Sequence, residues 1–321
     1  MRELLSLFMK KQSSAIRFSL PALSSRPEAA GLVWGAVGVL AFSFTVPMTR
    51  VAVSELSPMF VGSGRAVVAA LLAACALAIT RQRLPTSRQW LRIAAVSGGV
   101  VAGFPLLTSC ALTAVPASHA AMVTGLLPAV TAVAAVLRAG ERPRRSFWVF
   151  GGLGAAAVLL FTGLHNGGLG RLEPADLLLL AAVVAAAIGY AEGGLLAREL
   201  GTWQVVCWAL VLALPVMSGL TILFTAQRPP SAGPAAWAAF AYLAVVSMFL
   251  GFFAWYRGLA IGPMAQVSQV QLAQPVLTIA WAGLLLGEAI TWLTVLGGAG
   301  VVGCAATATS CRARTAPGSP G

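Results

Sequence analysis

Two charged side chains lie well inside long apolar stretches of this chain, and they are the first candidates for chemistry. Arg65 lies about seven residues into one stretch, and Glu192 lies about five residues before the end of another. If these stretches cross a membrane, each buried charge costs at least about 2.5 kcal/mol, so each is a candidate for a function such as solute contact. For Arg65 the alternative is that its long side chain reaches the nearer membrane surface. The two residues differ in depth, so no ion pair between them is expected.

Two prolines interrupt other apolar stretches. Pro128 and Pro275 each lie about ten residues into their stretch. A proline in that place removes one backbone hydrogen bond and kinks the helix. One interpretation is a kink that serves packing alone. The other, which the symmetric pair favours, is that carbonyl groups freed at Thr124 and Gln271, four residues upstream, face a polar central cavity.

A row of polar residues precedes the second proline, and it contains Gln266, Ser268, Gln269, Gln271 and Gln274. Amide side chains in a membrane need hydrogen-bond partners, so this row is expected to face the interior of the protein. His119 occupies the place of Gln266 in an earlier stretch. Two roles stay open, hydrogen bonds between helices and contact with a solute. The candidates for solute contact are Arg65, His119, Thr124, Pro128, Glu192, Gln269, Gln271, Gln274 and Pro275.

The residues do not support catalysis, metal binding or nucleic-acid binding. The five cysteines lie far apart without metal-binding spacing, and His119 and His165 are the two histidines. An enzyme would need convergent groups, such as paired carboxylates or a metal-binding His and Glu set, and the sequence shows none. We therefore expect no catalytic residues, no cofactor and no metal. The net charge of +12 is spread in short clusters between apolar runs, so nucleic acid is not an expected partner.

Composition places these residues in a membrane protein. The chain has 321 residues, of which 59% are hydrophobic and 9% charged, and its mean hydropathy is +0.87. Soluble domains carry about 25% charged residues, so this chain lacks the polar surface to face water. A crossing helix needs about 20 apolar residues. Ten segments satisfy this, near 31–49, 58–80, 91–111, 117–137, 147–163, 175–197, 203–224, 235–256, 262–286 and 292–310.

The positive charges predict how these ten helices are oriented. Of the 21 basic residues, 17 fall in the N-terminal region or in segments that share its side of the membrane. Because basic residues favour the cytoplasmic side, both termini are expected in the cytoplasm. Residues 1–30 are expected to form a cytoplasmic tail, since the apolar patch Leu4–Met9 is too short for the core of a signal peptide. Residues 311–321 are expected to form the other cytoplasmic tail.

The chain contains an internal repeat. Aligning residues 111–141 with 258–288, at an offset of 147 and without a gap, gives nine identical pairs among 31 positions, including Pro128 with Pro275. Composition alone predicts about three such pairs. A unit of five helices is odd in number, so the second copy must enter the membrane from the opposite side. Inverted repeats place a solute site near the middle of the membrane and permit inward-open and outward-open states.

Each half resembles the repeat of the drug/metabolite transporter (DMT) superfamily, in its ten-helix EamA-type branch. The resemblance covers about residues 31–310 and rests on Ser57-Pro58, Arg65, Ala111-Leu112, Pro128, Gly140-Glu141-Arg142, Gly151, Gly258-Leu259, Pro275, Gly287-Glu288 and Gly298. Leu212 stands where the seventh helix would repeat Arg65, so the halves are not strictly symmetric. The implied fold class is an all-α integral membrane protein with ten transmembrane helices. The implied domains are two inverted five-helix EamA-like repeats over 31–165 and 172–310.

The resemblance implies a transporter that moves a small metabolite, amino acid or drug-like solute across the cytoplasmic (inner) membrane by alternating access. Its partners would be that solute and the lipid bilayer, and a homodimer stays open. A membrane-embedded enzyme and a channel are the alternatives, and the inverted repeat argues against both. The substrate and the direction, import or export, are also open. Arg65 favours a solute with a carboxylate or another anionic group.

Energy coupling depends on an acidic residue that can exchange a proton. Small proton-coupled members of the superfamily typically carry one in the first helix, whereas this chain has none between Gly31 and Met48. Glu192 is the one acidic residue deep enough in an apolar segment to replace it. We therefore expect a proton-coupled mechanism to depend on Glu192, and an exchanger or facilitator to work without it.

Overall fold

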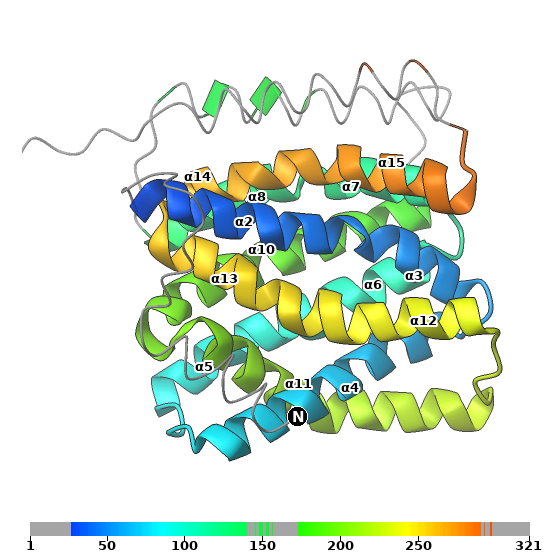
Figure 1. Cartoon of the computed structure of the whole chain (residues 1–321), viewed down its shortest axis with the longest axis horizontal. Helices are drawn as coiled ribbons and strands as arrows, with labels where there is room; N and C mark the ends of the chain where they lie inside the picture. Colours follow the sequence, from blue (N-terminus) through cyan, green and yellow to red (C-terminus); the bar gives the residue numbers. More distant parts are fainter. Residues whose placement is uncertain are drawn as a thin grey trace, which may run out of the picture.

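The computed structural model describes residues 27–139 and 173–289, together with a few isolated positions outside these ranges. The regular structure of these residues is helical, and no strand occurs among them. The helices lie side by side in one bundle and run back and forth along it (Figure 1). The expected all-α fold is therefore confirmed for the described part of the chain.

Each half contributes eight helical segments to the described part of the chain. The first half contains α2 (Pro27–Ser43), α3 (Thr45–Val53), α4 (Pro58–Thr80), α5 (Ser87–Val96), η1 (Ser97–Gly103), α6 (Phe104–Ala111), α7 (Ala117–Thr124) and α8 (Leu127–Ala139). The second half contains α10 (Pro174–Leu200), α11 (Thr202–Gln227), α12 (Pro234–Tyr242), η2 (Leu243–Leu250), α13 (Gly251–Ile261), α14 (Met264–Gln269), η3 (Val270–Ala273) and α15 (Gln274–Leu286).

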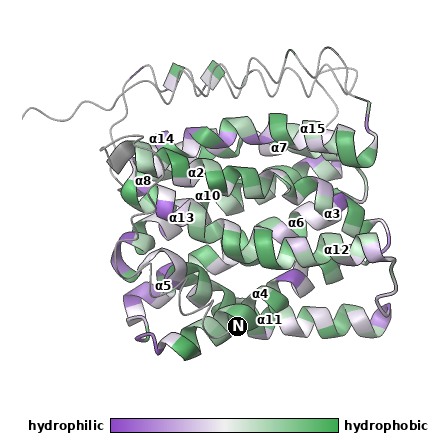
Figure 2. Cartoon of the chain, viewed as in Figure 1, coloured by the Kyte–Doolittle hydropathy of each residue, from purple (hydrophilic) through white to green (hydrophobic). Residues whose placement is uncertain are grey.

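Eight stretches of helix in the described ranges are long and apolar enough to cross a membrane. They are Ala29–Val53, Pro58–Thr80, Ser87–Ala111, Ala117–Arg138, Pro174–Leu200, Thr202–Gln227, Pro234–Ile261 and Gln266–Leu286. Each corresponds to one of the ten predicted segments. The other two, 147–163 and 292–310, lie outside the continuously described residues. Figure 2 shows hydrophobic residues along most of the helix length, with many of the hydrophilic ones near the ends of the bundle.

One face of the first helix illustrates how the bundle meets lipid. Val33, Val37 and Leu40 follow one another at helical spacing on α2, and their exposed fractions are 54%, 49% and 51%. On the opposite face Val39 and Phe42 are buried. A large apolar surface that faces outward in this way is stable only in an apolar surrounding, which agrees with a membrane protein.

Local signals explain where some helices begin and end. Helix α5 begins at Ser87 rather than near residue 91, because Thr86 and Gln89 form a capping box in which the Thr86 N–H donates to Gln89 Oε1 at 2.9 Å. Helices α10 and α11 are separated by Gly201 alone. Its φ of +98° is open to glycine and strained for other residues, so two long helices can turn within a single residue.

The two halves share their irregular backbone segments. The π-helical segments η1 (Ser97–Gly103) and η2 (Leu243–Leu250) match at the offset of 147 to within one residue. The breaks before α8 and α15 also match, and each is followed directly by a proline, Pro128 or Pro275. Both prolines are the second residue of their helix, in its first turn, where a missing N–H costs no hydrogen bond. The predicted kinks are therefore breaks between two shorter helices.

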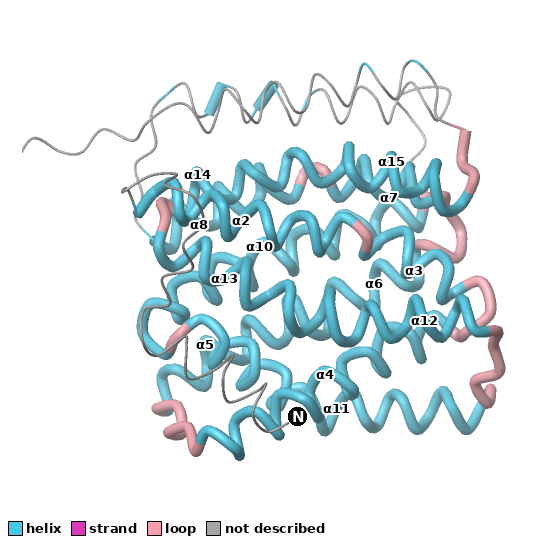
Figure 3. Tube along the Cα trace, viewed as in Figure 1, coloured by secondary structure: helices cyan, strands magenta, loops and turns pink. Residues whose placement is uncertain are grey.

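Equivalent loops of the two halves lie at opposite ends of the bundle. Residue 84, in the loop between α4 and α5, and residue 231, in the loop between α11 and α12, differ by the offset of 147. Figure 3 shows these two loops at opposite ends. The described helices therefore have the geometry of an inverted repeat, as the odd number of helices per unit predicts.

Glycines allow the two halves to approach closely at two places. Helix α2 packs on α13, where a Cβ added to Gly31 would lie 2.8 Å from the Gly262 Cα. Segment η1 packs on α10, where a Cβ added to Gly99 would lie 2.3 Å from the Ala185 carbonyl oxygen. Small residues at such contacts are how membrane helices gain packing energy, because lipid supplies no hydrophobic force between them. The glycines thus set the distance between the halves.

A matched pair of substitutions tests this packing. Gly99→Ala should destabilise the protein by about 1–3 kcal/mol relative to Gly98→Ala, because only the first methyl group meets backbone atoms. Around Gly98 nothing lies within 4 Å of an added Cβ, and both variants gain the same helix propensity. The melting midpoint of the purified protein in detergent measures the difference. Equal midpoints for the two variants would show that the halves do not depend on this contact.

Candidate solute-binding site

A small cavity of about 20 Å³ lies between the two halves. This volume is enough for about one water molecule, and a larger solute would need the cavity to widen. Its lining from the first half is Phe42, Thr45, Val46, Arg65, Val100, Phe104 and Pro105. Its lining from the second half is Tyr190, Ser247, Met248, Phe252 and Gln274. Several of these residues lie near the middle of their membrane-crossing stretch, so the cavity lies near the level of the membrane centre.

The matched π-helical segments supply part of the cavity wall. Val100 belongs to η1, and Ser247 and Met248 belong to η2. A π-helical turn contains an extra residue and is often found at functional sites. The two segments are equivalent in the repeat, so each half contributes one of them to the cavity wall.

Arg65 is the charged residue of the cavity. It is 1% exposed, and its Nε and Nη2 have no hydrogen-bond partner among the described residues. Gly62 and Gly64 flank it on α4, where they let the backbone approach Leu106 and Phe240. Arg65 therefore lines the cavity and does not extend to the membrane surface.

A pair of hydroxyl groups joins the halves at the cavity wall. Thr45 Oγ1 on α3 and Ser247 Oγ on η2 lie 2.8 Å apart, and both residues are buried. A polar group in this environment is costly unless it is hydrogen-bonded, so the pair is a stable link between the two halves. Sequence reasoning missed both residues, because single Ser and Thr residues are common in membrane helices and carry no signal of their own.

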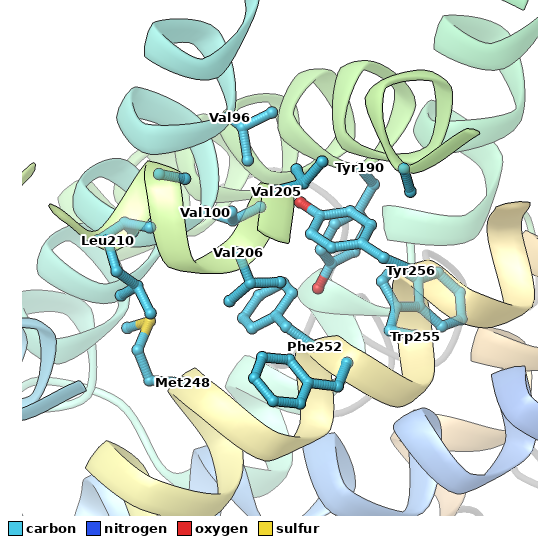
Figure 4. Packing of buried hydrophobic residues seen from close by; sticks show 14 of the residues in the cluster. Val96, Val100, Tyr190, Val205, Val206, Leu210, Met248, Phe252, Trp255 and Tyr256 are labelled. Atoms are coloured by element: carbon cyan, nitrogen blue, oxygen red, sulfur yellow. The ribbon is translucent and has the colours of Figure 1, made fainter. Parts of the chain in front are cut away.

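Aromatic rings form the apolar part of the wall. The ring centroids of Phe42 and Phe252 lie 4.9 Å apart, and those of Tyr190 and Phe252 lie 6.1 Å apart. Tyr190 also packs on Trp255, at 5.4 Å between centroids. Figure 4 shows Tyr190, Phe252 and Trp255 gathered at one place between α10 and α13. These contacts join the rings into a continuous apolar wall.

The structure brings two of the nine predicted site residues to this cavity, Arg65 and Gln274. His119 lies elsewhere, with its Nε2 2.6 Å from Asp176 Oδ1 in a buried pair. Thr124 donates its hydroxyl hydrogen to the Ala120 carbonyl at 2.8 Å.

The remaining predicted residues are not part of the cavity lining, and their contact with a solute stays a prediction. Gln269 and Gln271 are buried at 0% and 1% exposure. The amide atoms of Gln269 have no hydrogen-bond partner within the described ranges. Pro128 and Pro275 are the second residues of the helices α8 and α15.

Glu192 also lies outside the cavity lining and belongs to a cluster of ion pairs. Its Oε2 lies 3.0 Å from Arg92 Nε, and its Oε1 accepts from Arg138 Nε. Arg92 additionally binds Glu199, with 2.6 Å between Nη1 and Oε1. Helix α10 extends to Leu200, so Glu192 lies farther from the helix end than the sequence indicated. These pairs were missed because the arginines precede Glu192 by 100 and 54 residues.

Glu288 forms a further link between the halves. Its two carboxylate oxygens accept from the N–H groups of Ala117 and Ser118, each at 3.1 Å. These are the first backbone N–H groups of α7, and a carboxylate stabilises such a helix start. The carboxylate therefore caps a helix of the other half. Among the described residues no group of His, Cys, Asp and Glu side chains is placed to hold a metal ion.

The repeat, the apolar crossing helices and the cavity between the halves together define a multi-pass membrane transporter. Residues 29–163 and 173–309 each match the EamA-like transporter family, so the chain belongs to this family. The two matches show two EamA repeats, which confirms the predicted relationship to the drug/metabolite transporters.

Two relatives and one solved structure extend the comparison. The chain is 44% identical over 278 residues to the uncharacterized transporter YdeK of Bacillus subtilis (strain 168), which covers 87% of this chain and 96% of that protein. It is 27% identical over 283 residues to a probable terminal-alkyne amino-acid exporter of Streptantibioticus cattleyicolor, covering 84% and 91%. A solved crystal structure with 21% identity and a TM-score of 0.69 covers 88% of this chain and 97% of its own, and it shows the same fold.

Proposed function

We propose that the protein carries a small solute across the cytoplasmic membrane by alternating access, with the solute bound in the cavity between the halves. The observation that supports this most directly is that each half contributes part of the wall, from α2, α3, α4, η1 and α6 on one side and from α10, η2, α13 and α15 on the other. A site between two inverted halves can face either side when the halves tilt against each other. The proposed role is transport alone, without catalysis.

The proposal includes ten membrane-crossing helices, with repeats over 31–165 and 172–310 and with both termini in the cytoplasm. The distribution of basic residues supports this orientation. The end of the bundle where α2 begins and α10 ends is then the cytoplasmic end. The cluster of Glu192, Arg92 and Arg138 lies toward this end and joins α10 to α5 and α8. We propose that these ion pairs must break when the cavity opens to the cytoplasm.

A comparison of metabolites identifies the transported solutes. We expect cells that express the protein to differ from cells without it in a small set of metabolites, measured separately in the cells and in the medium. The rate at which these metabolites cross the membrane of vesicles that contain the purified protein should saturate as their concentration rises. A name that a relative carries, such as amino-acid exporter, supplies a first set of compounds to test. Unchanged metabolites in both compartments would contradict the proposal.

Cysteine labelling tests the inverted topology and the orientation. In a background without native cysteines, Ser231→Cys should react in intact cells with a membrane-impermeant thiol reagent, and Leu84→Cys should react only after permeabilisation. Both positions are exposed, and they are equivalent in the repeat. Mass spectrometry of the labelled protein measures the reaction. Labelling of both from the same side would contradict the inverted repeat, and exchanged sides would contradict the orientation.

A further inference from the structure

We propose that the cavity binds a small monocarboxylate with an apolar body, and that Arg65 holds its carboxylate. This inference rests on the proposed function, because it names the class of solute that the same cavity takes. The guanidinium of Arg65 is buried, lines the cavity and leaves Nε and Nη2 without partners in the described part of the chain. A buried charge without a partner is costly. A carboxylate matches the planar donor fork of arginine and would satisfy it with two parallel hydrogen bonds.

The fold itself does not require a charge at this place. Leu212 occupies the equivalent position in the second half and is 37% exposed. Both α4 and α11 form as long helices, one with the arginine and one with the leucine. The charge of Arg65 is therefore specific to the cavity side of the first half, as expected for a ligand contact.

The charge balance of the cavity indicates a monoanion. Arg65 is the one charged side chain among the described residues that line it. One carboxylate neutralises it, whereas a dianion would leave an unbalanced charge in surroundings of low dielectric constant. The same lining contains no acidic residue. An ammonium group on the solute would therefore find no carboxylate partner there and would add no affinity.

The remaining wall indicates an apolar body for the solute. Phe42, Tyr190 and Phe252 present aromatic rings, and Met248 and Val100 add aliphatic surface. The hydroxyl groups of Thr45 and Ser247 bind each other. With these hydroxyls paired, aromatic and aliphatic side chains make up most of the wall, and Gln274 adds one amide.

Four related compounds test the proposal on the wild-type protein. Thermal stabilisation of the purified protein should give an affinity for 3-phenylpropionate at least tenfold higher than for 3-phenylpropionamide and for 2-phenylethylamine. L-phenylalanine, which adds an ammonium group, should bind no more tightly than 3-phenylpropionate. Equal or tighter binding of the amide or the amine would overturn the proposal, as would tighter binding of L-phenylalanine. Failure of 3-phenylpropionate to bind at millimolar concentrations would overturn it as well.

Substitution of the arginine localises the contact. Arg65→Gln should weaken 3-phenylpropionate binding roughly tenfold to a hundredfold, because a hydrogen-bonded charge pair is lost, and should leave amide binding nearly unchanged. Arg65→Lys should restore part of the affinity. The matched control Arg228→Gln removes an exposed arginine and should change neither. An Arg65→Gln protein that elutes as folded protein and binds 3-phenylpropionate normally would overturn the role of Arg65.

The metabolite comparison separates this inference from the proposed function. Solutes moved by the wild-type protein should carry a carboxylate, and cells with Arg65→Gln should lose their movement. If the wild-type protein moves neutral or cationic solutes, transport stands and the carboxylate inference is overturned. If no metabolite changes, the proposed function fails, and this inference fails with it.

Discussion

Replacing Glu192 with glutamine is expected to expose the cavity more often toward the end of the bundle where α10 ends. The test uses a protein without native cysteines that carries Ser247→Cys as a reporter in the cavity wall. Adding Glu192→Gln should raise the rate of its reaction with an impermeant thiol reagent from that end roughly five- to 150-fold. The reason is that one carboxylate of the second half holds both Arg92 and Arg138 of the first half.

The exposure of the side chains paired with Glu192 determines how much free energy the substitution costs. The Glu192 side chain is 7% exposed, whereas that of Arg138 is 55% exposed. After the substitution Arg138 can turn toward water, and Arg92 keeps its contact with Glu199. The loss is therefore about 1–3 kcal/mol, below the roughly 3–5 kcal/mol of a fully buried pair. Such a loss changes the ratio of two conformations about five- to 150-fold.

Glu199→Gln is the matched control for this experiment. Glu199 binds the same Arg92, but its side chain is 46% exposed, so its ion pair contributes little. Its effect on the reaction rate should stay below about twofold. Equal acceleration by the two variants, or none by Glu192→Gln, would contradict a gate at this cluster.

The same variant tests whether Glu192 carries a proton. A proton carrier replaced by glutamine would lose transport driven by a pH gradient and keep exchange between preloaded vesicles. We expect both activities to change together, because Glu192 lies outside the cavity lining and must break two ion pairs before it accepts a proton. Selective loss of gradient-driven transport would show that the carrier role is correct.

Placing a large side chain in the cavity is the second prediction with a large expected effect. Ser247→Trp should reduce transport of the solutes moved by the wild-type protein at least tenfold, to the level of cells without the protein. Ser247 is 5% exposed and lines a cavity of about 20 Å³, so an indole there fills the space that a bound solute would need. Solute uptake or release, normalised to the amount of folded protein, measures the effect.

Two controls separate this blocking from other causes. Ser247→Ala removes only the hydrogen bond with Thr45, so it should cost about 1 kcal/mol of stability and leave transport within a few-fold of the wild type. Val245→Trp adds the same bulk to the same π-helical segment, where Val245 is 36% exposed, and should be tolerated. Normal transport by a folded Ser247→Trp protein would show that the solute follows another path.

The sequence alone determined the class of protein and its symmetry. Long uncharged stretches predicted the eight crossing helices that the structure describes. A chain that crosses lipid must satisfy its own backbone hydrogen bonds, which an apolar helix does. The internal repeat predicted the inverted geometry, because a repeat unit of five helices, an odd number, reverses the direction of the second copy. Arg65 was visible as a candidate because a charge stands out in an apolar helix, and the structure places it in the cavity.

Only the tertiary structure decided which side chains meet. Thr45 and Ser247 are 202 residues apart, and Glu192 is 100 residues from Arg92. Such contacts depend on how each helix is rotated about its axis and how closely its neighbours approach. Packing at glycines such as Gly99 helps to set this rotation and this distance. A hydropathy pattern does not show which glycines lie at such contacts. The π-helical segment η2, which brings Ser247 to the cavity, was also not predictable from the sequence. Its extra residue per turn lies within a continuous apolar run, so the hydropathy pattern does not reveal it.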